Sequence, residues 1–175
     1  VIARRTGAKT LWFSWQNLRR QYPPHFSWME RYNLTHIDYG IVGSESAAGV
    51  WRAKGFTKPL AVIPQFGVDP SLFHPPAKRR PGSPVHIAYI GRLVPEKGVD
   101  LLLDALSSLN GVWRATLIGG GPAAADLKAQ AERLNVQRAV TFHDAVPSTA
   151  MPDIYRDIDI LVLPSRTKAS WVEQF

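Results

Sequence analysis

The chain has 175 residues, and at roughly 150 residues per domain this length predicts either one full domain with part of another or two incomplete domains. Hydrophobic residues make up 45% of the sequence and charged residues 20%, which excludes a disordered chain and allows a packed core. There is no cysteine, so disulfides, thiolate nucleophiles and cysteine-ligated metal sites are excluded. No apolar run approaches the roughly 18 residues that a membrane-spanning helix needs.

The two ends of the sequence suggest a fragment. The chain opens at Val1 without an initiator methionine and stops at Phe175, just after a turn-rich stretch. No signal peptide with a charged start and an apolar middle is visible. We therefore expect a piece of a longer protein, and the lack of cysteine favours the reducing cytoplasm as its location.

The net charge of +7 is unevenly distributed along the chain. Up to Gly82 there are 12 basic and 4 acidic residues, a net charge of +8, whereas the rest has 9 basic and 10 acidic residues, a net charge of −1. A basic half is typical of proteins that bind nucleic acid, an anionic membrane surface or phosphorylated small molecules. A solvated basic face is the alternative.

The first half alternates short β-branched and aromatic runs with helical patterns. We expect strands over 10–14, 39–42 and 60–63 and helices over 26–34 and 46–54, which together would form the end of an α/β domain. The segment 75–84 follows, with four prolines, three adjacent cations and no apolar periodicity, as is typical of a linker. The predicted division is therefore 1–74, a linker 75–84, and a second domain 85–175.

The second half repeats the strand–helix pattern more regularly. We expect strands over 85–90, 113–118, 139–142 and 158–163, and helices over 99–109, 123–134 and 148–156, with Ser148 as the N-cap of the last helix. Strands that alternate with helices predict a parallel, doubly wound sheet of the Rossmann type, so the fold class is α/β.

Ligands of such sheets bind beyond the carboxyl ends of the strands, so the residues that follow each strand are the candidate site. Arg92 and Lys97 follow the first strand of the second half and could clamp a diphosphate, although an ordinary surface loop is the alternative. The glycines 119–121 follow the second strand and would allow a ligand to approach closely, or simply form a tight turn. Residues 144–146 and 165–173 follow the other two strands.

Four segments of the second half, in this order, resemble the donor-binding domain of retaining nucleotide-sugar glycosyltransferases of family four. They are 90–98 (IGRLVPEKG), 118–122 (IGGGP), 162–165 (VLPS) and 171–175 (WVEQF). Upstream, 62–69 (VIPQFGVD) and 73–75 (FHP) resemble the stretch that leads from the family's first domain into its linker. The resemblance implies a GT-B architecture: the end of an N-terminal Rossmann-like domain, followed by most of the C-terminal donor domain.

The resemblance also implies roles for individual residues. Arg92 and Lys97 match the family's cations on the donor diphosphate, and Glu173 matches the first of two glutamates, which hydrogen-bonds the hydroxyls of the transferred sugar. The second glutamate would lie eight positions later, beyond Phe175. The remaining donor-binding residues implied are Gly91, Gly119, Gly121 and, beside the nucleobase, Val146.

The implied reaction is transfer of a hexosyl group from a nucleoside-diphosphate sugar to a saccharide or lipid-linked acceptor, with retention of configuration. The donor is a substrate, and we expect no separate cofactor. Metal binding is not expected either, because Asp157 and Asp159 flank a strand instead of converging. Six aromatic residues of the first half are candidates for an acceptor groove, with core packing as the alternative: Trp12, Trp15, Tyr22, Phe26, Trp28 and Tyr32.

Two other hypotheses of function stay open. The basic first half suggests a nucleic-acid-binding protein, but its cations are scattered and no nucleic-acid-binding motif is present, so nucleic acid is not the expected partner. A nucleotide-sugar-binding module without turnover is the other, and the chain by itself is expected to be inactive. The basic half would also suit peripheral contact with anionic lipid on the inner face of a membrane.

Overall fold

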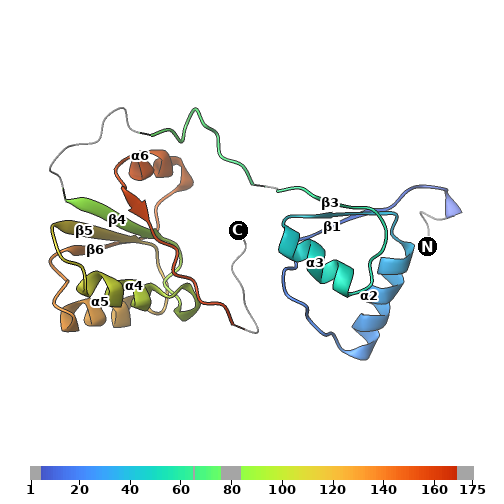
Figure 1. Ribbon diagram of the computed structural model, residues 1–175, viewed down its shortest axis with the longest axis horizontal. Helices are drawn as coiled ribbons and strands as arrows, with labels where there is room; N and C mark the ends of the chain where they lie inside the picture. Colours follow the sequence, from blue (N-terminus) through green and yellow to red (C-terminus); the bar gives the residue numbers. More distant parts are fainter. Residues whose placement is uncertain (1–4, 65, 76–83, 169–175) are drawn as a thin grey trace. The chain divides into compact units, whose positions relative to one another are not determined.

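The computed structural model describes residues 5–64, 66–75 and 84–168. These residues form two compact units, one up to Gly67 together with Lys168 and the other from Val68 to Thr167 (Figure 1). Both units are α/β structures with parallel sheets, as the strand and helix patterns predicted. We call them unit 1 and unit 2.

Unit 1 is built on a three-stranded parallel sheet in the order β1-β2-β3. The strands are β1 (Leu11–Ser14), β2 (Tyr39–Val42) and β3 (Leu60–Val62), and the helices α2 (Pro24–His36) and α3 (Glu45–Ala53) connect them. Because the strands follow one another in space in chain order, right-handed connections place both helices on the same face of the sheet (Figure 1).

The core of unit 1 lies between that face and the two helices. Its buried residues are Val42, Ala47, Trp51 and Phe56, with Trp12 and five other apolar side chains packed around them. The Ser44 side chain caps α3 by accepting a hydrogen bond from the backbone N–H of Ala47 at 3.3 Å. Helix α2 has no fully buried residue, and it begins two residues earlier than predicted because Pro24 suits its first turn.

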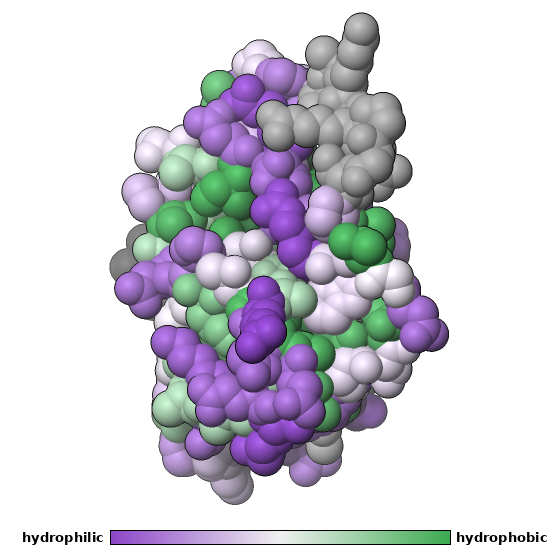
Figure 2. All heavy atoms as spheres, turned by 90° about the vertical axis from the view of Figure 1, so that its left-hand side faces the viewer, coloured by the Kyte–Doolittle hydropathy of each residue, from purple (hydrophilic) through white to green (hydrophobic). Residues whose placement is uncertain are grey.

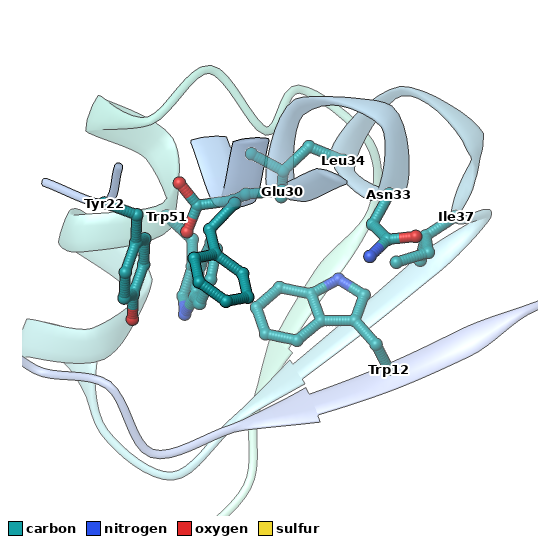
Figure 3. Close-up of a pocket in the computed structure, with 8 residues that line it drawn as sticks. Trp12, Tyr22, Glu30, Asn33, Leu34, Ile37 and Trp51 are labelled. Carbon is teal, nitrogen blue, oxygen red and sulfur yellow. The ribbon is translucent and has the colours of Figure 1, made fainter. Parts of the chain in front are cut away.

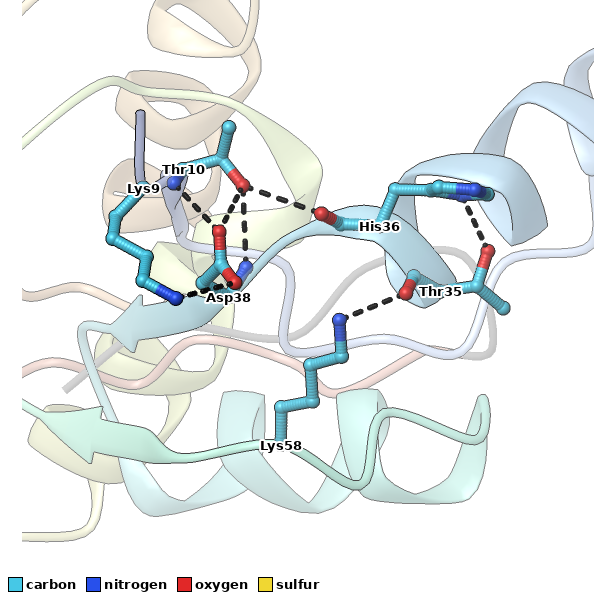
Figure 4. A network of polar contacts seen from close by, with 6 residues as sticks. All are labelled: Lys9, Thr10, Thr35, His36, Asp38 and Lys58. Carbon is cyan, nitrogen blue, oxygen red and sulfur yellow. Dashed lines mark hydrogen bonds and ion pairs between the residues drawn. The ribbon is translucent and has the colours of Figure 1, made fainter. Parts of the chain in front are cut away.

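A polar network ties the start of β1 to the residue that precedes β2 (Figure 4). The Asp38 carboxylate accepts hydrogen bonds from the backbone N–H of Thr10 at 2.9 Å and from its hydroxyl at 3.0 Å, and the Lys9 ammonium lies 3.7 Å away. The hydrogen bonds from Thr10 lower the pKa of Asp38 below its ordinary value. The network is therefore intact at neutral pH and weakens only as the pH falls through this lowered value.

Unit 2 is built on a four-stranded parallel sheet in the order β6-β5-β4-β7. Its strands are β4 (Val85–Ile90), β5 (Trp113–Ile118), β6 (Val140–His143) and β7 (Ile160–Leu161). After β6 the chain crosses back over β5 and β4 to reach β7. Figure 1 shows the result, with α4 (Val99–Ser107) and α5 (Ala124–Arg133) on one face and α6 (Met151–Arg156) on the other.

Two local predictions for unit 2 were wrong. Ser148 is not a helix N-cap: it begins a short 3₁₀ turn, η2 (Ser148–Ala150), after Pro147, and its side chain makes no capping bond. The last strand is much shorter than 158–163, because only Ile160 and Leu161 pair in register with β4. The hydrogen bonds from Asp159 N–H to the His86 carbonyl and from Val162 N–H to the Ala88 carbonyl extend the contact slightly at each end.

The core of unit 2 packs α4 and α5 against the sheet. It includes Tyr89 and Leu93 from β4 and its loop and Leu103 from α4, all at most 2% exposed. At the amino end of the sheet, the buried His86 ring lies within hydrogen-bond distance of the Thr116 hydroxyl (2.7 Å) and the Asp157 carbonyl (2.6 Å). His86 is thus a satisfied core residue.

The outer surface is of ordinary mixed character on the face shown in Figure 2, where hydrophobic residues lie in separate areas between hydrophilic ones. Scattered exposed apolar side chains, such as Val112 at 76% exposure, are normal on a folded protein.

Replacing Leu103 by Ala should destabilise unit 2 by about 2–5 kcal/mol, because the side chain is fully buried and its loss leaves a cavity. Leu101→Ala on the same helix is the matched control, since Leu101 is 47% exposed, and its effect should stay within about 1 kcal/mol. Urea unfolding followed by circular dichroism measures both, and equal losses in the two variants would contradict this packing.

Candidate functional site

The strand order of unit 2 creates a switch point between β4 and β7. From β4 the chain proceeds to β5 and β6 on one side, and it then returns to β7 on the other side of β4. Loops that leave neighbouring strands in opposite directions open a crevice at the carboxyl ends of those strands, where ligands of this architecture bind. The crevice expected here is flanked by the residues after β4, including Gly91 and Arg92, and by those after β7.

Backbone hydrogen bonds join the loops at this edge. Gly91 N–H donates to the Ile118 carbonyl at 2.9 Å, which continues the pairing of β4 with β5 beyond the strand ends. Leu93 N–H donates to the Gly120 carbonyl at 2.9 Å, and Gly119 N–H donates to the carbonyl of His143, the last residue of β6, at 3.0 Å. The structure therefore brings Gly91, Arg92, Gly119 and Gly121 together.

Gly119 and Gly121 are required by the contact between these two loops. A Cβ on Gly119 would lie 1.9 Å from the Gly91 carbonyl oxygen, and a Cβ on Gly121 would lie 2.2 Å from the Leu93 carbonyl oxygen. Gly119 also has a φ of +142°, which side-chain-bearing residues rarely adopt. Gly120, in contrast, faces open space. The space left by two of the three glycines is thus used by the protein's own backbone.

Tyr89 holds the backbone of Arg92 in place. Its ring is 1% exposed, and its hydroxyl donates a hydrogen bond to the Arg92 carbonyl at 2.8 Å. The Arg92 side chain is exposed, and no residue in the described ranges forms an ion pair or side-chain hydrogen bond with its guanidinium. A cation with a fixed backbone and an uncommitted side chain is suited to bind an anion at the crevice.

Lys97 belongs to a short 3₁₀ turn, η1 (Pro95–Lys97), that leads into α4. Arg166, in the loop after β7, is hydrogen-bonded to this turn and forms an ion pair with Asp100 in the first turn of α4. The Arg166 guanidinium lowers the pKa of Asp100, so this pair stays charged at neutral pH. The turn that carries Lys97 is thereby attached to the loop after β7.

The remaining predicted site residues are less well placed. Val146 is half-buried in the loop after β6, and it lies at the carboxyl edge because of the topology. Glu173 lies outside the described residues. Within those residues, no group of three or more histidine, aspartate and glutamate side chains is arranged to hold a metal ion. No helix in the described ranges is both long and apolar enough to cross a bilayer.

Unit 1 contains a separate aromatic pocket of about 340 Å³ (Figure 3). Three of the six candidate aromatic residues, Trp12, Tyr22 and Phe26, line it together with Trp51. A buried ion pair lies beside it, in which the Lys54 ammonium is 2.6 Å from the Glu30 carboxylate and 4.9 Å from the Tyr22 and Trp51 rings. The other residues that line the pocket are Glu30, Asn33, Leu34 and Ile37.

The other three candidate aromatic residues lie elsewhere on unit 1. Trp15 stacks on Phe66, with ring centroids 5.2 Å apart, while Trp28 is 68% exposed on α2 and stacks on Tyr32. The six candidate residues therefore do not line one common pocket, and Trp12 also packs against the core of unit 1.

Comparison with known proteins identifies the second half of the chain. Residues 72–175, more than half of the sequence, match the family model "Glycosyl transferases group 1". The chain belongs to this family. The matched region contains the strands β4 to β7 and every residue of the candidate site.

Individual relatives agree with this assignment. The chain is 32% identical over 144 residues to the GDP-mannose-dependent alpha-(1-6)-phosphatidylinositol monomannoside mannosyltransferase of Mycobacterium tuberculosis, covering 76% of this chain and 37% of the relative. It is 31% identical over 118 residues to the D-inositol 3-phosphate glycosyltransferase of Corynebacterium glutamicum, covering 57% of this chain and 28% of the relative. The chain thus spans about a third of the length of the curated relatives it matches.

The fold matches solved GT-B glycosyltransferase structures. The lipopolysaccharide outer core galactosyltransferase WaaB superposes with a TM-score of 0.70 at 22% identity, covering 93% of this chain and 45% of WaaB. HepE of Anabaena in complex with UDP superposes with a TM-score of 0.69 at 18% identity, covering 93% of this chain and 48% of HepE.

Three residues that shape the site were not identified from the sequence: Tyr89, Asp100 and Arg166. Tyr89 gives a weak signal, since a tyrosine in an otherwise aliphatic buried strand needs a partner for its hydroxyl. Asp100 and Arg166 give none, because they are 66 residues apart and only the fold brings them together.

Gly119→Ala should displace the loop after β4 and destabilise unit 2 by roughly 2–4 kcal/mol, because the new methyl group would collide with the Gly91 carbonyl. Gly120→Ala is the matched control and should change stability by less than about 1 kcal/mol, since no atom lies within 4 Å of the added carbon. Thermal unfolding of both variants measures the difference. A Gly119→Ala variant as stable as Gly120→Ala would show that the two loops are not in contact.

Proposed function

We propose that this chain is the donor-binding part of a retaining glycosyltransferase of family four, which transfers a hexosyl group from a nucleoside-diphosphate sugar to a saccharide or lipid-linked acceptor. In this proposal 85–175 binds the donor, 75–84 is a linker and 1–74 is the end of the acceptor-side domain. By itself the chain is expected to bind donor nucleotide without transferring sugar.

The observation that carries the proposal is the placement of Arg92 at the switch point of the unit 2 sheet. Its backbone is fixed by Tyr89 and by the contact with the loop after β5, while its guanidinium is available to a ligand. A planar guanidinium can donate two parallel hydrogen bonds to phosphate oxygens. Lys97, from the turn before α4, would add a second positive charge.

These cations suit the chemistry of glycosyl transfer. When the bond between the sugar and the diphosphate breaks, negative charge grows on the diphosphate oxygens. Positive charges that are already in position stabilise this state more than they stabilise the bound donor, and so they accelerate the reaction. In this proposal Arg92 and Lys97 contact the departing diphosphate, and Glu173 hydrogen-bonds the hydroxyls of the transferred sugar.

The relatives support the class of donor. One is named as GDP-mannose-dependent, and one of the structural neighbours was solved with UDP. Both nucleotides are nucleoside diphosphates, which are the product that remains after the sugar leaves. The titration below compares uridine with guanosine as the base of the donor.

Arg92→Ala and Lys97→Ala should each weaken binding of the donor nucleotide by about tenfold or more, because a hydrogen bond to a charged group contributes about 1.5–3 kcal/mol. Isothermal titration of the purified chain with UDP and with GDP measures this. Arg114→Ala is the matched control: it removes one positive charge at the amino end of β5, where Arg114 is paired with Asp157.

The outcomes of this titration are distinct. Weaker binding in both site variants, with unchanged binding in Arg114→Ala, supports the assignment. If the unaltered chain binds neither nucleotide, the donor-binding function is wrong. Normal binding in Arg92→Ala would mean that the diphosphate lies elsewhere. Sugar transfer by this chain to added acceptor would contradict the expectation that it is inactive alone.

The proposal includes contact of unit 1 with an anionic membrane surface. Between residues 10 and 37 there are three arginines and one acid, Glu30, and this acid is neutralised by Lys54. Trp28 and Met29 are 68% and 51% exposed on α2, beside Arg31. Exposed aromatic side chains among cations are typical of surfaces that insert shallowly between lipid headgroups.

The double variant Trp28→Ala with Arg31→Ala should reduce binding to vesicles that contain phosphatidylglycerol by about tenfold, since each cation near such a surface contributes about 1 kcal/mol and the indole adds apolar burial. Co-sedimentation measures this, with vesicles of phosphatidylcholine alone as the control lipid and Arg138→Ala in unit 2 as the control variant. Equal binding to both lipids would exclude the contact.

A further inference from the structure

Arg166 fastens the loop after β7 to the turn before α4. Its backbone N–H donates to the Glu96 carbonyl at 2.8 Å, and its guanidinium donates to the Pro95 carbonyl, also at 2.8 Å. The same guanidinium donates to both oxygens of the Asp100 carboxylate, at 2.8 and 2.5 Å. One residue thus supplies four hydrogen bonds between two segments that are about 70 positions apart in sequence.

The two segments also touch through their backbones. The Pro164 carbonyl oxygen lies 2.2 Å from the position where a Cβ of Gly98 would be, so no side chain fits between them. Gly98 has a φ of +65° and links η1 to α4. This contact lies at the switch point, on the side of β4 that faces β7.

The Arg166 side chain is already committed within the protein. The side chain is 30% exposed, and its guanidinium makes a bidentate ion pair with Asp100, a geometry that a lysine cannot reproduce. Arg92 differs, because its guanidinium has no partner in the part of the chain that the structure describes. Two arginines at the same edge therefore have different surroundings: one is available to a ligand and the other joins two loops.

We infer that Arg166 and Asp100 are positioning residues of the donor site, whose ion pair fixes the loop after β7 to the turn that carries Lys97. The inference rests on the proposed function, because Lys97 is placed there on the donor diphosphate. The pair sets where Lys97 stands relative to Arg92, and it holds the residues that follow β7 at this edge of the sheet. Neither member of the pair contacts the donor.

Asp100→Asn tests this inference by the sign of its effect. If the pair positions Lys97, loss of the carboxylate loosens the turn, and affinity for UDP or GDP falls by about tenfold. If Arg166 instead bound the diphosphate itself, removal of the neighbouring negative charge would release its guanidinium, and affinity would stay equal or increase. Isothermal titration distinguishes the two, and the second result would overturn the inference.

Two more variants separate positioning from charge. Arg166→Lys keeps the positive charge but cannot form the bidentate hydrogen bonds to Asp100. It should therefore weaken nucleotide binding about as much as Asp100→Asn. The double variant Arg166→Ala with Asp100→Ala should bind no more weakly than either single variant, because each change already breaks the same contact. Additive losses would show that the two residues act independently and would contradict the inference.

Amide hydrogen exchange gives a readout that does not depend on nucleotide. Arg166→Ala and Asp100→Asn should speed exchange across residues 93–101 by about tenfold, since the turn loses its attachment. Arg114→Ala, which breaks an ion pair of the same type at the amino end of the sheet, should leave this segment unchanged. Unchanged exchange in the Arg166 variant would overturn the inference even if its nucleotide binding is weaker.

The two proposals can fail separately. If the unaltered chain binds neither UDP nor GDP, the donor-binding function fails, while the exchange measurement still decides whether Arg166 holds the turn. If the unaltered chain binds nucleotide and Asp100→Asn binds it equally well or better, only the positioning role fails.

Discussion

Direct contact between backbones at the carboxyl edge of the unit 2 sheet is the constraint on which the rest of the candidate site depends. At Gly98 and Gly119, a carbonyl oxygen of another loop occupies the place where a side chain would begin. Packing this close leaves the loops after β4 and β5 few alternative conformations. The same contacts satisfy backbone N–H and carbonyl groups, which pair with one another instead of with water. A rigid edge of this kind can hold cations in place before a ligand arrives.

The elements of unit 2 could be predicted closely where sequence pattern and burial agree. The strands 85–90 and 113–118 were confirmed to the residue, because each is a mainly apolar run that is followed by a glycine and lies in the centre of the sheet. The last strand was overestimated, since the run 158–163 is equally apolar while pairing with β4 depends on where the crossing chain arrives. Local pattern determines what can form a strand, and tertiary contact determines how much of it does.

The candidate site could be predicted only in part, for the same reason. Arg92 and the glycines at 119 and 121 follow strands directly, so a parallel topology is enough to bring them to one edge. Their supporting residues have no such signal. Tyr89 resembles any core residue of its strand, and the pairing of Asp100 with Arg166 becomes visible only once β7 is known to lie beside β4. The residues proposed to contact a ligand are thus easier to find in this sequence than the residues that support them.

The net charge of each half does not coincide with the proposed anion site in this chain. The basic half before Gly82 has the larger charge, whereas the half that contains the proposed diphosphate site has a net charge of −1. Three acids of the second half, Asp100, Asp153 and Asp157, are each paired with an arginine, and opposite charges this close together largely cancel each other's field at a distance. The Arg92 guanidinium, which has no such partner in the described part of the chain, therefore contributes an uncompensated positive charge at the carboxyl edge. A slightly acidic domain can in this way present a cationic site, and mutation of its paired arginines should affect structure before it affects the attraction of the ligand.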